Sequence, residues 1–229
     1  MDLAAVKDAP ARELGRAAAA AARNAVSLAD DAELLSVASR PARASSLAGL
    51  AVEEVGKAGA LAVLAVMPEN LRARAPVGRM LEWHQMKLVA GQLVAAVPFG
   101  APPTLLNKLA AMSPAEIADI LDNAQMIAVD VDQLKQLGLY VDVDRSGQIR
   151  EPSRVTAAQL RGQLGLARQA ASASDGLLDP TLTTWFEAPQ AIAIEFSAAL
   201  VSAFAETGHG RTPEAAAEVL LNAATKLQN

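Results

Sequence analysis

The spacing of apolar and polar positions predicts a chain built almost wholly of helices. Between Arg12 and Ser39, small and apolar residues recur at intervals of three and four positions, while the charged residues fall largely off that stripe. The stripe consists of Leu14, Ala18, Ala21, Ala25, Leu28, Ala32 and Leu35. This spacing predicts a long amphipathic helix that ends before Pro41.

Prolines and capping residues divide the rest of the chain into further helices. Ser113, Pro114 and Glu116 stand in the order of an N-cap, a first-turn proline and a reciprocal cap, which predicts that a helix begins there. Threonine opens each of the last three helical patterns. The predicted helices after the first span residues 42–67, 77–97, 114–136, 156–173, 181–206 and 212–227.

One segment alternates like a strand rather than a helix. Leu139 to Val143 alternates, and Asp144 to Gly147 is a turn-forming run before Gln148 and Ile149, so a short β-hairpin is expected near 139–150. The predicted fold class is therefore all-α, an antiparallel helical bundle with this hairpin insertion. We expect a single domain over 1–229, with a core over 12–160 and extra C-terminal helices over 156–228.

Composition removes several function classes. The chain has no cysteine and two histidines, so disulfides, thiol catalysis and cysteine-ligated metals are excluded, and no metal or other cofactor is expected. The net charge of −5 argues against tight DNA binding without a local basic patch. We find neither the order of a signal peptide nor an apolar stretch of membrane-spanning length, and expect a cytoplasmic protein that does not bind membranes.

Three charged residues interrupt the otherwise apolar second helix. Glu53, Glu54 and Lys57 stand among small and apolar neighbours, and Glu54 falls on the apolar stripe that includes Leu50 and Leu61. A carboxylate carried into a core needs a cation or several donors. We therefore predict that this cluster meets His84 or Lys87 on the next helix; the alternative is a solvated surface pair.

A second cluster lies in the third predicted helix. His84 and Lys87 are three residues apart and share a face, whereas Arg79 lies five residues before His84 and about 140° away around a continuous helix. Histidine titrates near neutral pH and arginine binds phosphate, so this set can supply a general acid or base and a phosphate anchor. The alternative is a buried His84 bonded to the glutamates, with Arg79 in solvent.

Three segments together resemble the AbiV family of bacterial abortive-infection proteins, within the HEPN-like superfamily of helical bundles. They are the run from Arg43 to Lys57 with its Glu-Glu-Val-Gly-Lys element, His84-Gln-Met-Lys87, and the run from Leu139 to Pro152. The resemblance covers roughly residues 12–160. It implies a HEPN-like bundle that pairs with a second copy of itself and acts in defence against phage.

Catalytic members of that superfamily are metal-independent ribonucleases that use an arginine and a histidine separated by four to six residues. Arg79 and His84 fit this spacing, but Met80 follows the arginine where catalytic members favour a polar residue. The first hypothesis is a homodimeric binding module for a phage or host protein. The second is a ribonuclease acting on RNA, in which His84 moves protons, Arg79 and Lys87 hold the phosphate, and Glu53 or Glu54 orients His84.

Overall fold

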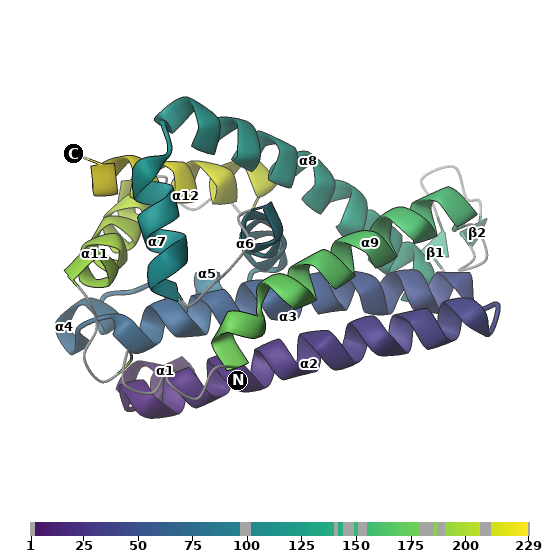
Figure 1. The fold of residues 1–229 in the computed structure, drawn as a ribbon, viewed down its shortest axis with the longest axis horizontal. Coiled ribbons are helices and arrows are strands. Elements are labelled where there is room, and N and C mark those ends of the chain that lie inside the picture. The colour runs from purple at the N-terminus through teal and green to yellow at the C-terminus, as the bar shows by residue number, and fades with distance from the viewer. Residues whose placement is uncertain are drawn as a thin grey trace.

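The computed structural model describes residues 3–96, 102–139, 142–143, 149–150, 155–178, 186, 191–206 and 212–228. Helices account for nearly all of them, so the fold is all-α (Figure 1). The helices are α1 (Leu3–Asp8), α2 (Ala11–Val37), α3 (Pro41–Val66), α4 (Glu69–Arg72), α5 (Val77–Leu81), α6 (His84–Ala96), α7 (Pro102–Ala111), α8 (Pro114–Leu139), α9 (Ala157–Ala173), α11 (Ala191–Glu206) and α12 (Pro213–Gln228), with a 3₁₀ turn, η2 (Asp175–Leu178).

The long α2 and α3 form a helical hairpin along one side of the molecule (Figure 1). Their connection is tight: Ser39 has a positive φ of 58°, and Pro41 occupies the first turn of α3. Most of the α2 stripe predicted from the sequence is buried, with Ala18, Ala25 and Ala32 having no exposed surface, while Leu28 and Leu35 are partly buried. Alanine side chains let the two helices pack closely, so the first predicted helix and its amphipathic face are confirmed.

Helix α3 is the central element of the fold. It packs against α2, α6, α8 and α9, and Figure 1 shows α9 running across α3 while α6 and α8 lie behind and above it. A helix with neighbours on so many sides is buried around most of its circumference. Glu53, Glu54 and Lys57 lie on α3 itself, and His84 and Lys87 lie on α6, which packs against it.

The C-terminal helices α11 and α12 pack against the helices that surround α3. Helices α11 and α12 pack on each other, α12 also packs on α8 and α6, and α7 lies beside them (Figure 1). Helix α12 begins where predicted, with Ala215 N–H donating to Thr212 Oγ1 at 3.3 Å. Helix α11 covers the latter part of the predicted 181–206 helix; residues 181–185 and 187–190 lie outside the described part of the chain.

Capping chemistry at α8 and α9 agrees with the sequence. Ser113 N–H donates to Glu116 Oε2 at 2.8 Å and Glu116 N–H donates to Ser113 Oγ at 3.2 Å, while Thr156 and Gln159 form the same reciprocal cap. Helix α7 is not among the helices predicted from the sequence; it begins at a pair of prolines, Pro102 and Pro103. Proline is well suited to a first helical turn.

The hairpin region contributes only a minimal pairing. Strand β1 (Asp142–Val143) pairs antiparallel with β2 (Ile149–Arg150), with Asp142 opposite Arg150 and Val143 opposite Ile149. The predicted turn at 144–147 lies outside the described residues. Two residues from each strand do not establish an independent hairpin, so the insertion stays a prediction.

Candidate functional site

A buried carboxylate joins three helices at the centre of the molecule. Glu53 lies midway along α3, and only 3% of its surface is exposed. Its Oε1 pairs with the ammonium of Lys135 on α8, and its Oε2 lies 2.8 Å from His84 Nδ1 and 3.2 Å from Lys87 Nζ, both on α6. The predicted contact between the α3 charged cluster and α6 is therefore present, and it is made by Glu53.

The α8 side of this cluster has its own support. Lys135 is also 3% exposed, and its Nζ lies 2.8 Å from Asp132 Oδ1, one turn earlier. Gln85 on α6 donates from Nε2 to Asp132 Oδ2 at 3.1 Å. A chain of polar contacts thus runs from α3 through α8 and back to α6, and we call these residues the Glu53 cluster: Glu53, His84, Gln85, Lys87, Asp132 and Lys135.

Small residues in α3 bring the three helices close enough to form it. A Cβ on Gly56 would lie 1.9 Å from the Lys87 carbonyl oxygen, so only glycine lets the α6 backbone approach here. On the other side, a Cβ on Gly49 would lie 3.2 Å from Lys135 Cβ. The glycines four residues before and three residues after Glu53 therefore admit the helices that carry its two lysine partners.

The electrostatics of the cluster keep its central ion pair charged. Burial by itself raises the pKa of Glu53, but the bond and charge of Lys135, together with His84 and Lys87, outweigh it and hold that pKa below the usual carboxyl value. Burial also opposes the charged form of Lys135, but Asp132 and Glu53 raise its pKa overall. The charges of the two carboxylates, Glu53 and Asp132, then offset those of the two ammonium groups, Lys87 and Lys135.

His84 is the exposed member of the cluster. It is the first residue of α6, and 60% of its side chain is exposed although Nδ1 faces buried Glu53. Within the described part of the chain, no hydrogen-bond partner is recorded for its Nε2. A carboxylate on one ring nitrogen fixes the orientation of the imidazole and leaves the other nitrogen open to a partner or substrate.

Arg79 is placed differently from the prediction. The helix expected over 77–97 is wrong as one element: α5 ends with Glu82 N–H donating to Gly78 O, and α6 starts with Lys87 N–H donating to Trp83 O. Arg79 Nη1 donates to the Phe204 carbonyl of α11 at 3.3 Å. The Arg79 side chain also lines a groove of about 420 Å³ beside that helix. Because Arg79 and His84 lie on different helices, the 140° separation expected for one continuous helix does not apply to them.

The second glutamate of the motif is also placed differently. Glu54 was expected on the core stripe, but Glu53 takes the buried position, and Glu54 forms a part-exposed pair with Lys57 at 3.1 Å. The reason is that α3 is enclosed on several sides, so one apolar stripe does not define its buried face. The pair lines a groove between α1, α2 and α3, apart from the Glu53 cluster.

Sequence reasoning missed the α8 half of the cluster. Lys135 is the sole cation of α8, which carries five acidic residues, and it lies one turn after Asp132. That isolated lysine in a buried helical face was the available signal. Among the described residues, no group of three or more His, Cys, Asp or Glu side chains is arranged to hold a metal ion.

Comparison with known proteins identifies the family of this chain. Residues 13–171 match the HEPN_AbiV family model, described as AbiV, and this is well over half of the chain. The chain belongs to the AbiV family. The match includes every residue of the Glu53 cluster and ends before α11 and α12. No curated protein and no solved structure matches significantly.

AbiV membership indicates a role in abortive infection, a bacterial defence against phage. It also agrees with the helical architecture of the described residues. In these residues, no helix is both long and apolar enough to cross a bilayer. The residue roles expected from the resemblance remain predictions.

Proposed function

We propose that this AbiV-family protein is a dimeric binding module that recognises a phage or host protein during abortive infection. The proposal rests on the observation that Arg79 and the two lysines of the Glu53 cluster are already bound to other groups of the chain. Lys87 and Lys135 pair with Glu53, and Arg79 donates to the α11 backbone. The residues expected to hold a phosphate are thus committed to contacts inside the chain.

The charge balance supports the same conclusion. Glu53 and Asp132 offset Lys87 and Lys135, and the whole chain carries a net charge of −5. Binding of a nucleic-acid backbone rests on excess positive charge that replaces condensed counterions. A neutral cluster in an acidic protein suits a protein partner better, with the cluster holding α3, α6 and α8 in register.

Pairing with a second copy is supported by exposed apolar side chains. Met126 and Ile127 on α8 are 63% and 40% exposed, and Leu34 and Val37 at the end of α2 are 68% and 87% exposed. Twofold dimers are the commonest soluble oligomers and use one self-complementary patch. Light scattering should give twice the chain mass, and a monomer at all concentrations would contradict the dimer.

The ribonuclease alternative is favoured by one observation, the exposed ring of His84 held through Nδ1 by Glu53. In that role Glu53 would fix the tautomer, and Nε2 would take or give the proton during cleavage at a phosphodiester. Such chemistry would not require a metal, so activity would survive EDTA.

One experiment separates the two functions. Purified protein is incubated with bulk cellular RNA in EDTA, beside His84→Ala and the neighbouring exposed-site control Glu82→Ala. The binding-module proposal expects intact RNA in all three samples while the wild-type gene protects cells from phage. Cleavage that falls about 100-fold or more in His84→Ala and persists in Glu82→Ala would overturn the proposal in favour of the ribonuclease.

A further inference from the structure

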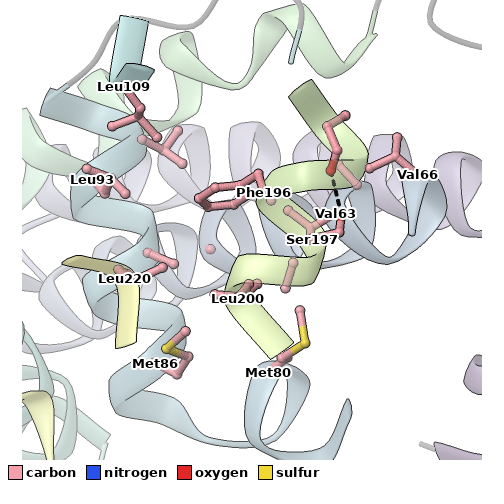
Figure 2. A pocket seen from close by; sticks show the side chains of 17 residues that line it. Val63, Val66, Met80, Met86, Leu93, Leu109, Phe196, Ser197, Leu200 and Leu220 are labelled. Carbon is pink, nitrogen blue, oxygen red and sulfur yellow. Dashed lines mark hydrogen bonds between the residues drawn. The ribbon is translucent and has the colours of Figure 1, made fainter. Parts of the chain in front are cut away.

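An apolar cavity lies between the central helix and the C-terminal helices, and no residue of the Glu53 cluster lines it. It has a volume of about 90 Å³ and is enclosed by α3, α5, α6, α7, α11 and α12. Figure 2 shows Phe196 and Leu200 of α11 on one side of it and Met80, Met86 and Leu93 around the rest. The cavity thus joins helices inside the AbiV match to helices beyond it.

The lining offers almost nothing to a polar ligand. Every lining residue is apolar except Ser197, and the Ser197 hydroxyl donates to the Ala193 carbonyl of its own helix at 2.7 Å (Figure 2). A buried water needs two to four polar partners, and a charged ligand needs more. The chemistry of this space therefore selects an uncharged, apolar occupant.

Helix packing does not require a glycine at position 59. A Cβ at Gly59 would meet only Val94 Cγ2, at 3.9 Å, which is an ordinary contact. This differs from Gly56, one turn earlier, where a Cβ would collide with the α6 backbone. Glycine in a helix interior is less favourable than alanine, so the chain carries a costly residue here without a steric need for it.

Part of the cavity lining is less deeply buried than the rest. Gly59, Ala60, Val63 and Ala90 line it and are only partly buried, whereas Leu109 and Met80 are almost completely buried. We expect a ligand to enter past these partly buried residues rather than past the buried ones. The flexible side chains of Met80 and Met86 can adjust to its shape.

We propose that this cavity, which we call the Gly59 cavity, is a binding site for a small uncharged hydrocarbon-like molecule. Its volume is below the approximately 150 Å³ of an apolar cavity that accepts benzene, so it takes a group of only a few carbon atoms. A ligand of this size binds no more tightly than about millimolar. The site contains no residue of the Glu53 cluster, and its proposal does not rest on the partner-binding function.

The test uses the full chain with its methionine methyl groups labelled with ¹³C. Propane is titrated under pressure, with ethanol as a polar control that has the same number of non-hydrogen atoms. We expect the Met80 and Met86 methyl signals to shift and saturate with propane and to stay in place with ethanol. Met126, which is 63% exposed on α8, serves as the internal control and should not shift.

Matched variants assign the effect to the cavity. Gly59→Leu fills the space and should weaken propane binding about tenfold or more, whereas Gly165→Leu on α9, where a Cβ meets nothing within 4 Å, should leave it unchanged. Ala60→Val repeats the test if Gly59→Leu does not fold. Shifts that never saturate, equal shifts at Met126, or full binding in the filled variants would overturn the proposal and leave the cavity a packing gap.

Discussion

Glu53 is a buried carboxylate that links α3 to both α6 and α8. It is 3% exposed and contacts cations on two different helices, so its removal leaves buried Lys135 with one carboxylate partner fewer, Asp132 being the other. The neighbouring Glu54 is equally charged but part-exposed, and it pairs with Lys57, one turn away on the same helix. Two adjacent glutamates thus make very different contributions.

Replacement of Glu53 by alanine should lower the free energy of unfolding by about 3–5 kcal/mol, the usual effect of breaking a buried ion pair. Urea denaturation of the purified variant measures this change. Glu54→Ala is the matched control and should cost no more than about 1 kcal/mol, because exposed pairs contribute little. Equal losses in the two variants would contradict the assignment of Glu53 as the buried partner.

The pH dependence of stability should follow from the same pair. Because the folded-state pKa of Glu53 is lowered, its contribution is fully present above the ordinary carboxyl value of 4.5 and is lost as pH falls through the folded-state value. The pKa of Lys135 is raised, so its contribution is present below 10.5 and is lost as pH rises through its higher folded-state value.

Urea unfolding of wild type and Glu53→Gln over a pH series checks the acid limb. The stability difference between the two proteins should shrink below pH 4.5, since protonation removes the charge from the wild-type carboxylate. A difference that stayed constant from neutral pH into the acid range would show that Glu53 is not ionised in the folded protein.

Among the secondary-structure elements, the close approach of α3 and α6 depends on Gly56. Gly56→Ala should cost about 1–3 kcal/mol, since its Cβ would meet the Lys87 carbonyl oxygen at 1.9 Å and force the helices apart. Gly162→Ala in α9 has open space around the new Cβ and should instead stabilise by about 0.5–1 kcal/mol. Thermal melts of the two variants should therefore move in opposite directions.

The sequence predicted those elements whose pattern lies within one short segment, and not those that depend on contacts between distant segments. The apolar stripe of α2 and the Ser113 cap are local patterns, and both were predicted. The break at Glu82 and Trp83 carries no proline or glycine, and the choice of Glu53 over Glu54 depends on which helices enclose α3. Lys135 lies 82 residues from Glu53, and although its isolation in α8 marks it as unusual, no local pattern identifies Glu53 as its partner.

For the whole molecule, α11 and α12 complete a core that the AbiV match alone does not cover. Phe196, Leu200 and Leu220 are buried against the rest of the chain. A chain truncated after Leu178 should therefore expose this apolar surface and either melt at lower temperature or aggregate. Calorimetry and size-exclusion chromatography measure both outcomes; an unchanged melting temperature in a monodisperse product would show that the C-terminal helices are dispensable.

The alanine-lined hairpin of α2 and α3 has a consequence for the order of folding. Its contacts join segments that are adjacent in the chain, and buried alanine loses no rotamer entropy, so the hairpin can form early and at low entropic cost. Ala25→Gly should therefore mainly slow refolding. Lys135→Met, which disrupts a contact between distant segments, should mainly accelerate unfolding, and stopped-flow chevron plots would distinguish the two kinetic effects.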